Sequence, residues 1–196
     1  MHWHSDVEPS RFRLSLRLAY PFYRIFERAV LERAESIVAT SPPYRETSRP
    51  LEPWAHKCQV VPLGLAPGRL PDVPEEQKSG LWHTQGLRAL AVGRLTYYKG
   101  FETLVRAAVA SPGVELVIVG EGEERAGLEA ILEKAGRPAR IRLAGEVDDA
   151  TLCRLMASCD VYCLPSRERT EAFGVVLLEA MRYAKPLLVS DLAGTG

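Results

Sequence analysis

The sequence predicts an α/β protein whose second half is an open parallel sheet. Short apolar runs bounded by Gly, Pro or Asp recur at 88–93, 115–120, 140–145, 160–165 and 187–190. Because both faces of each run are apolar, we expect strands that helices cover on either side. The segments between them carry apolar residues at helical spacing. The four apolar sets are Phe101, Leu104, Val105 and Ala108; Leu128, Ile131, Leu132 and Ala135; Leu152, Leu155, Met156 and Cys159; and Leu177, Ala180, Met181 and Ala184. Four strand–helix repeats followed by a fifth strand indicate right-handed crossovers within one parallel sheet.

The first 87 residues hold fewer elements. We expect a helix over 11–34 and strands over 36–41 and 58–63, while residues 2–7 look like the end of a further strand. Pro and Gly are frequent between 62 and 86, which predicts a linker. Two strands and a helix do not close a domain, so we expect a fragment. Its parts are the end of an N-terminal domain with its crossover (1–66), a linker (67–87) and a sheet domain truncated at its C-terminus (88–196).

Composition argues against several classes of function. Lys plus Arg and Asp plus Glu both number 25, and this zero net charge gives no support to nucleic-acid binding. No apolar run approaches the roughly 20 residues that a membrane span needs, and the first residues lack the basic and apolar regions of a signal peptide. The four cysteines, at 58, 153, 159 and 163, lack metal-site spacing. We expect reduced thiols in a cytoplasmic protein, and no bound metal.

A glycine-bounded loop with two cations follows the first strand of the predicted sheet. It runs from Gly93 through Arg94 and Lys99 to Gly100, next to the start of a helix. Backbone N–H groups and the positive end of that helix favour an anion, and the two cations suit a diphosphate. Taken alone, the loop fits ordinary solvated charges slightly better, and the Walker spacing is absent.

The turn after the second strand is less specific. Gly120 and Gly122 flank Glu121 at a helix start and match half of a dinucleotide fingerprint, but no third glycine is in register. A tight strand-to-helix turn explains these glycines as well as a binding loop does.

Two glutamates eight residues apart follow the fourth strand. Glu171 precedes Phe173 and Gly174, and Glu179 interrupts the apolar run 175–181. A carboxylate in such a run is costly to bury without a partner. Glu179 lies about 7.5 Å into a helix that begins near Gly174. This separation fits one carboxylate on a sugar and the other on a ribose diol. A helix-start acid followed by a salt-bridged glutamate is the structural alternative.

In this order, the motifs resemble those of the retaining glycosyltransferases of family 4, whose GT-B architecture has two Rossmann-like domains. The matching motifs are Gly93-Arg94-Leu95 with Lys99-Gly100, Val119-Gly120-Glu121-Gly122, Gly145-Glu146-Val147, and Glu171-Ala172-Phe173-Gly174 through Glu179. The combination is specific because each motif follows a strand. The resemblance covers 88–196. It implies a Rossmann-like C-terminal donor domain, incomplete here, preceded by a remnant of the acceptor domain.

The resemblance also implies roles for single residues. Arg94 and Lys99 would hold the diphosphate of a nucleotide sugar, Glu171 would contact the transferred sugar, and Glu179 the ribose hydroxyls. The remaining donor-binding positions would be Gly93, Gly120, Glu121, Phe173, Gly174 and Val175, with backbone at Glu146 and Val147 meeting the base. His4 follows a strand of the acceptor domain and corresponds to an active-site histidine, with His2 as the alternative.

The implied reaction moves a hexosyl group from a GDP- or UDP-linked sugar to a glycan or lipid-linked acceptor, with retention of configuration. Arg94, Lys99 and helix amides would stabilise the leaving diphosphate without a metal, and no Asp-x-Asp motif is present. We expect the parent protein to be the enzyme, and this chain to be inactive alone. A non-catalytic nucleotide-binding module is the alternative, whereas the spacing of the two glutamates disfavours an epimerase. The residues do not identify the donor, although the run around 170–174 leans toward a mannosyl- or rhamnosyl-type transferase of bacterial surface polysaccharide.

The helix over 11–33 carries six Arg against two Glu, interleaved with aromatic residues. Such a helix can lie on anionic lipid at the inner face of a membrane. Its apolar residues, however, are spread around much of the circumference. That distribution favours a buried helix over peripheral membrane contact.

Overall fold

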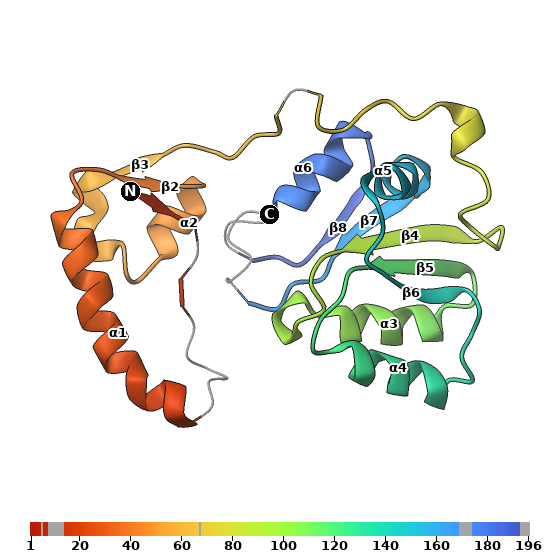
Figure 1. The fold of residues 1–196 in the computed structure, drawn as a ribbon, viewed down its shortest axis with the longest axis horizontal. Helices are drawn as coiled ribbons and strands as arrows, with labels where there is room; N and C mark the ends of the chain where they lie inside the picture. The colour runs from red at the N-terminus through yellow and green to blue at the C-terminus, as the bar shows by residue number, and fades with distance from the viewer. Residues whose placement is uncertain (5, 8–13, 67, 169–173, 193–196) are drawn as a thin grey trace. The chain divides into compact units, whose positions relative to one another are not determined.

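The computed structural model describes residues 1–4, 6–7, 14–66, 68–168 and 174–192 (Figure 1). These residues fall into two compact units, with the division at residues 63 and 64. The N-terminal unit contains the described residues up to 63, together with Asp191 and Leu192. The C-terminal unit contains those from 64 to 168 and from 174 to 190.

The C-terminal unit is built on five parallel strands in the order β6-β5-β4-β7-β8. In chain order its elements are β4 (Leu87–Val92), α3 (Phe101–Ala110), β5 (Val114–Val119), α4 (Arg125–Lys134), β6 (Ile141–Gly145), α5 (Asp149–Ser158), β7 (Val161–Leu164), α6 (Val175–Arg182) and β8 (Leu187–Val189). All five predicted strands are present and begin or end within two residues of the expected positions. The predicted α/β class with a parallel, Rossmann-like sheet is confirmed.

Helices cover both faces of this sheet, as Figure 1 shows. The side chains of each strand alternate between two apolar clusters. Ala89 and Ala91 of β4 pack with α3 and α4, whereas Leu90 packs with α5 and α6. The same alternation separates Leu116 and Ile118 from the two valines that flank them in β5. Burial on both faces explains why the strands read as continuous apolar runs.

The N-terminal unit holds three short parallel strands in the order β1-β2-β3. Its elements are β1 (His2–Trp3), α1 (Leu14–Arg33), β2 (Ile37–Ala39), α2 (Pro42–Thr47), the 3₁₀ helix η2 (Glu52–Lys57) and β3 (Cys58–Val60). A small core of buried apolar residues joins them: Trp3, Leu31, Ile37, Ala39, Tyr44 and Leu51. The strand expected within 2–7 is therefore present, but its paired part is only two residues long.

Helix α1 is not buried as its apolar pattern predicted. Leu31 is fully buried, but Leu18, Phe22, Ile25 and Phe26 are between 68% and 74% exposed. Their spacing of i, i+4, i+7 and i+8 places the four on one stripe of the helix. The expectation was wrong because apolar residues lie on two sides of this helix and only one side meets the small core. None of the helices in the described part of the chain has the length and apolar character that a membrane span requires.

The described residues between 64 and 86, within which we expect a linker, belong to the C-terminal unit and are attached to it by hydrogen bonds. They include the 3₁₀ turn η3 (Glu75–Gln77). Near the start of the segment, Tyr183 donates a hydrogen bond of 2.8 Å from its hydroxyl to the carbonyl of Pro71. Near its end, the indole N–H of Trp82 donates to the hydroxyl of Ser158 at 2.8 Å.

All four cysteines are free thiols. Burial raises the pKa of Cys159 and that of Cys163 to about 11. Both are therefore protonated near neutral pH, as expected of structural thiols.

Candidate functional site

The strand order places a topological switch point between β4 and β7. The chain goes from β4 to β5 and β6 on one side of the sheet, and β7 and β8 lie on the other side of β4. The crossovers on either side of such a point diverge, and ligands of open α/β sheets bind in the crevice at the carboxyl ends of the strands there. Arg167 joins the two loops that border the point, because its N–H donates to the carbonyl of Tyr98 at 2.7 Å.

Three predicted glycines pack the strand ends together. The N–H of Gly93 donates to Val119 at 2.9 Å, and the N–H of Gly120 donates to Gly145 at 2.7 Å. A Cβ atom at Gly120 would lie 2.1 Å from the carbonyl oxygen of Gly93, and the φ angle of 130° at Gly120 also disfavours a side chain. Gly122 is equally tight, because a Cβ there would lie 2.4 Å from the carbonyl oxygen of Leu95. Close backbone packing accounts for the Gly-x-Gly pattern.

The two predicted diphosphate cations have different surroundings. Lys99 ends the 3₁₀ turn η4 (Tyr97–Lys99) and is only 9% exposed. Its side chain lies beside Gly93, since a Cβ at that glycine would be 3.5 Å from the Lys99 Nζ. The side chain of Arg94 is 74% exposed and lies 3.8 Å from a carboxylate oxygen of Glu123. The site therefore holds one confined cation and one that reaches into solvent.

Helices α3 and α6 both begin at the switch point, one after each of its two loops. Each starts from a left-handed glycine: Gly100 has φ 68° and Gly174 has φ 66°. Among the described residues, no side chain caps the first turn of either helix. Helix α5, by contrast, is capped by Asp148, which accepts a 2.6 Å hydrogen bond from the N–H of Thr151. The first-turn amides of α3 and α6 and the positive ends of both helices thus favour a bound anion.

Two buried hydroxyls lie in the same two loops. The Oγ1 of Thr96 follows β4, and the Oγ of Ser166 follows β7. Neither has a hydrogen-bond partner among the described residues. Buried hydroxyls are nearly always hydrogen-bonded, so a group outside these residues would be expected to satisfy them.

Glu179 is buried and paired. Its side chain is 8% exposed, and both Nε and Nη2 of Arg69 lie 3.4 Å from its Oε1. The apolar run around Glu179 predicted that the carboxylate would need a partner. The sequence did not reveal Arg69, which is 110 residues away. Val175, the first residue of α6, is 38% exposed.

The other predicted donor-binding residues surround the ends of β5 and β6. The Oε1 of Glu121 accepts a 2.6 Å hydrogen bond from Nη1 of Arg125, one turn further along the chain. Glu146 is exposed after the end of β6, and Val147 packs partly buried against the α5–α6 cluster. Glu171 and Phe173 lie outside the described residues.

His4 belongs to the N-terminal unit and is exposed directly after β1. Its ring stacks on that of His2, with the centroids 6.0 Å apart. Asp6 is a buried hydrogen-bond acceptor near His4 in the sequence, and sequence reasoning missed it. Its Oδ1 accepts hydrogen bonds from the Trp3 indole, the Tyr44 hydroxyl and the Ser48 hydroxyl, at 2.9, 2.8 and 2.7 Å. The last two donors are about 40 residues away in the chain, which is why no local pattern revealed them.

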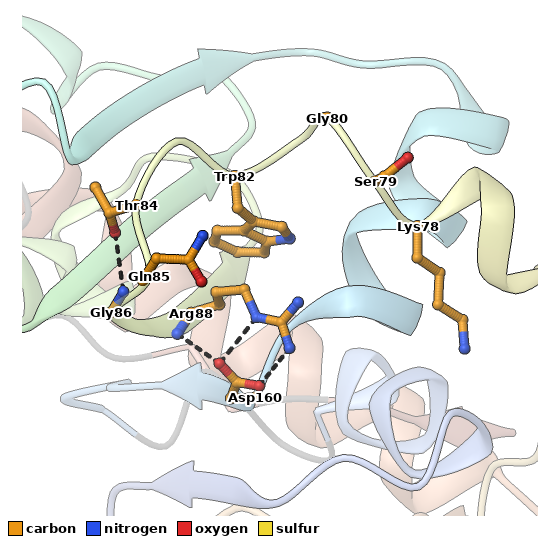
Figure 2. Close-up of a pocket in the computed structure, with 9 residues that line it drawn as sticks. All are labelled: Lys78, Ser79, Gly80, Trp82, Thr84, Gln85, Gly86, Arg88 and Asp160. Atoms are coloured by element: carbon orange, nitrogen blue, oxygen red, sulfur yellow. Dashed lines mark hydrogen bonds and ion pairs between the residues drawn. The ribbon is translucent and has the colours of Figure 1, made fainter.

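A polar pocket of about 420 Å³ lies at the opposite, amino-terminal edge of the same sheet. Figure 2 shows Arg88 and Asp160 at its floor. The guanidinium binds both carboxylate oxygens, at 2.9 and 2.6 Å, and the Arg88 N–H adds a third hydrogen bond. These hydrogen bonds lower the pKa of the Asp160 carboxyl. The charges of this pocket already neutralise each other, so the carboxyl edge is the better candidate site.

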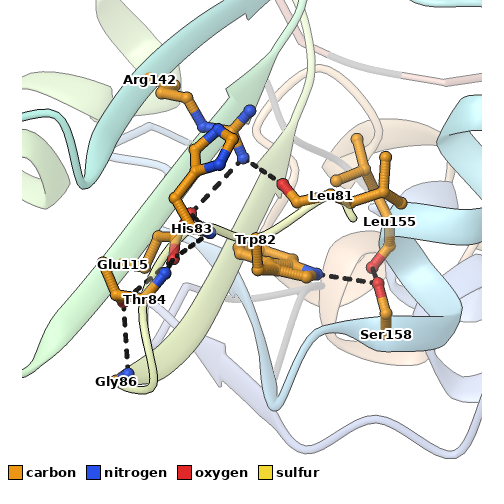
Figure 3. Close-up of polar contacts among 9 residues, drawn as sticks. All are labelled: Leu81, Trp82, His83, Thr84, Gly86, Glu115, Arg142, Leu155 and Ser158. Atoms are coloured by element: carbon orange, nitrogen blue, oxygen red, sulfur yellow. Dashed lines mark hydrogen bonds and ion pairs between the residues drawn. The ribbon is translucent and has the colours of Figure 1, made fainter. Parts of the chain in front are cut away.

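A second polar cluster, also near the amino-terminal edge of the sheet, has a structural role. Glu115 in β5 is fully buried and accepts from the backbone N–H groups of His83 and Thr84, at 2.9 and 2.7 Å (Figure 3). The Thr84 hydroxyl and Arg142 also donate to it, and Arg142 reaches the carbonyl of Leu81. Burial alone would raise the pKa of Glu115, but these hydrogen bonds lower it below its ordinary value. The cluster fastens residues 81–84 to the sheet. A lone acid in a buried strand was the signal that could have predicted it.

Residues 72–196 match the protein family described as Glycosyl transferases group 1. The chain is 35% identical over 196 residues to D-rhamnosyltransferase WbpZ of Pseudomonas aeruginosa, covering 99% of this chain and 49% of that protein. It is 32% identical over 197 residues to O-antigen chain mannosyltransferase C of Escherichia coli, covering 99% of this chain and 50% of the relative. The chain thus spans about half the length of these curated relatives.

Solved structures share the fold. Sucrose-phosphate synthase from Thermosynechococcus elongatus matches with a TM-score of 0.80 at 24% identity, over 98% of this chain and 50% of that chain. HepE from Anabaena, solved in complex with UDP and glucose, matches with a TM-score of 0.74 at 23% identity, over 98% and 53% of the two chains. At these identities the likeness establishes the architecture alone.

Proposed function

The chain belongs to the glycosyl transferases group 1 family, and from that premise we propose that its C-terminal unit binds the donor of a hexosyl transfer. The donor is a sugar linked to a nucleoside diphosphate. The whole protein moves the sugar to a glycan or lipid-linked acceptor. This chain supplies the donor site without sustaining catalysis alone.

The two uncapped helix starts at the switch point carry the proposal. Helices α3 and α6 begin at Gly100 and Gly174, on the two loops that border the point between β4 and β7. Asp148 caps α5, whereas no side chain in the described part of the chain caps the first turn of α3 or α6. Lys99 stands in one of these loops, and Glu179 lies in the second turn of α6. Amides and a cation suit a diphosphate, and a carboxylate suits a ribose diol.

The proposed chemistry is electrostatic stabilisation of a leaving group. When the bond between the glycosyl carbon and the phosphate oxygen breaks, negative charge develops on the diphosphate. Lys99 and the amides of α3 and α6 are held in place before the reaction, so they stabilise that charge without reorganising. Arg94 adds a mobile charge from the solvent side. The acceptor oxygen then bonds to the same face of the carbon, and its proton passes to the departing diphosphate. This route retains configuration, as in family 4, and uses no metal.

We assign Glu171 to the transferred sugar and Glu179 to the ribose. Gly93, Gly120 and Glu121 border the diphosphate, backbone at Glu146 and Val147 meets the base, and backbone from Phe173 to Val175 meets sugar and phosphate. His4 acts from the acceptor side. The names of two relatives, a D-rhamnosyltransferase and an O-antigen chain mannosyltransferase, support a mannosyl or rhamnosyl donor in surface polysaccharide synthesis.

A separate observation supports peripheral membrane contact through α1. Its stripe of Leu18, Phe22, Ile25 and Phe26 is exposed within this chain. Arg17, Arg24 and Arg28 share the neighbouring side at spacings of seven and four residues. An apolar stripe flanked by arginines matches the surface of an anionic bilayer. That location suits a lipid-linked acceptor.

Calorimetric titration of the chain with UDP and with GDP tests the donor site. We expect at least one of them to bind, and Glu179→Gln to weaken that binding about ten-fold, since a hydrogen bond to a charged group is lost. Arg182→Gln is the matched control, because Arg182 lies on the same helix as Glu179 but forms its ion pair with Asp72. A folded chain that binds neither nucleotide would refute the proposal.

A further inference from the structure

We propose that Arg69 is a positioning residue for Glu179, and that through this carboxylate it tunes recognition of the ribose diol of the donor nucleotide. The inference rests on the proposed function, which places that diol at Glu179. It goes further by assigning a role to a residue from the segment that precedes the sheet. Three observations within the C-terminal unit support it.

The first observation is the burial of Glu179. Its side chain is 8% exposed, and its neighbours on α6 include the buried residues Leu177 and Ala180. A carboxylate withdrawn from water to this extent must be compensated by a charge or by hydrogen bonds. Within the described part of the chain, Arg69 makes the only ion pair with Glu179 and the only hydrogen bonds to its side chain.

The second observation is the geometry of that pair. Both Nε and Nη2 of Arg69 lie 3.4 Å from the same oxygen, Oε1. Among the described residues, Oε2 accepts no hydrogen bond. A vicinal diol has two O–H donors and can address both oxygens of a carboxylate. Arg69 therefore binds Oε1 and leaves Oε2 for a ligand. At 3.4 Å the contact is long enough for a ligand hydroxyl to share Oε1.

The third observation is that the backbone around Arg69 is fastened to α6 independently of Glu179. Leu70 is 9% exposed, and the carbonyl of Pro71 accepts a 2.8 Å hydrogen bond from the Tyr183 hydroxyl. Asp72 pairs with Arg182 at 2.8 Å. Three consecutive residues thus hold the segment against the unit, with two contacts at the end of α6. Arg69 lies just before them and reaches back to the middle of the helix. Its placement is built into the segment, although its side chain is 62% exposed.

The inference is tested by combining substitutions of Arg69 with removal of the diol from the nucleotide. Binding of UDP and GDP to the full chain is measured beside that of the 2′,3′-dideoxy forms, which lack the diol. We expect the wild-type chain to bind the diol-bearing nucleotide about ten-fold more tightly than its dideoxy form, the worth of a hydrogen bond to a charged group. In Arg69→Gln we expect the ratio of the affinities for the diol-bearing and the dideoxy nucleotide to fall to about two-fold. The affinity for the dideoxy nucleotide itself should stay within about two-fold of that of the wild type. Arg69→Lys restores part of the ratio.

The controls separate this inference from the proposed function. Arg182→Gln breaks the neighbouring ion pair between the same segment and α6, and it should keep the wild-type ratio. Glu179→Gln should abolish the ratio. If the wild-type chain discriminates but Arg69→Gln discriminates equally, Arg69 has no role at the diol and only this inference falls. If the wild-type chain binds nucleotide without discrimination, the assignment of Glu179 to the ribose falls as well. Tighter diol binding by Arg69→Gln would show that the arginine competes with the ligand, which also overturns the inference.

Discussion

Gly100 lies so close to Pro165 that a Cβ atom at position 100 would stand 2.0 Å from the Pro165 carbonyl oxygen. Gly100 ends the loop after β4, and Pro165 begins the loop after β7. The two residues thus join the loops that border the switch point. The same glycine has φ 68° and starts α3 without a capping side chain. Gly100 therefore contributes both to the packing of the two loops and to the candidate site.

Gly100→Ala should destabilise the chain by about 2 to 5 kcal/mol. The left-handed backbone costs a side chain about 1–2 kcal/mol, and overpacking against Pro165 adds about 1–3 kcal/mol. Urea unfolding measures the change. Gly127→Ala is the control: it lies within α4 with open space around its Cβ position, so it should be neutral or stabilising. Equal stability of the two variants would contradict the close approach of the loops.

Lys99 and Arg94 should differ in the salt dependence of their contributions to nucleoside diphosphate binding. The charge of Arg94 is exposed and therefore screened by salt, whereas that of Lys99 is enclosed. We expect Lys99→Met to weaken binding about ten-fold or more at both 50 and 500 mM salt (about 1.4 kcal/mol per ten-fold). Arg94→Met should weaken binding only at the lower salt concentration. Calorimetry at both concentrations checks this, and identical salt profiles would count against the two distinct roles.

Glu115→Gln should remove a pH-dependent part of the stability. The folded-state pKa of Glu115 lies below its ordinary value. The ionised carboxylate therefore stabilises the fold above the unfolded-state pKa of about 4.3, and this contribution is lost as the pH falls through the folded-state value. At pH 7 we expect the variant to be about 1.5–3 kcal/mol less stable, since its hydrogen bonds lose their charge. Urea unfolding followed from pH 7 to well below pH 4 should show this difference in stability narrowing only as the pH falls below about 4.3.

Glu133→Gln is the control for that series. Glu133 forms an exposed pair with Arg137 one turn away, and such solvent-screened pairs contribute little to stability. If the free energies of unfolding of wild type and Glu115→Gln differ by a constant amount across the pH range, Glu115 does not hold residues 81–84 through its ionised carboxylate.

Helix α1 should bind anionic vesicles through its apolar stripe. Changing Phe22 and Phe26 together to Ser removes two side chains that are 74% and 68% exposed. We expect the double variant to lose most binding to vesicles of phosphatidylglycerol in a sedimentation assay, with an unchanged melting temperature. Val61→Ser changes an exposed apolar residue elsewhere in the N-terminal unit and should bind as the wild type does. Equal binding by all three proteins would exclude α1 as the contact.

The sequence predicted what local patterns determine. Glycine marks the strand ends because a Cβ at Gly120 would meet the backbone of Gly93, and because Gly93 and Gly145 have positive φ angles that favour glycine. The strands were placed within two residues. The burial of Glu179 and its need for a partner also followed from its apolar neighbours. The strand order could not be predicted from such local patterns, because the adjacency of β4 and β7 arises only when the sheet assembles. Long-range partners were missed for the same reason: Arg69 meets Glu179, and Tyr44 meets Asp6, only after folding.

The burial of α1 was the clearest error. Periodicity shows which residues share a face, but it does not show which of two apolar faces meets a core. Leu31 and Phe26 are both apolar residues of α1, yet one is buried and the other exposed. The small core of the N-terminal unit covers one side of the helix only. Comparing the apolar surface of α1 with the area that the small core can cover would have shown that part of the helix stays exposed.

The central claim is that a nucleoside diphosphate binds at the carboxyl edge of the five-stranded sheet. The most direct measurement is a titration of the ¹⁵N-labelled chain with UDP and GDP, followed by amide chemical shifts in solution. We predict that the largest changes will cluster at residues 93–101 and 174–179, around the starts of α3 and α6. Shifts confined to residues 78–88 and Asp160, around the pocket at the amino-terminal edge, would contradict the claim.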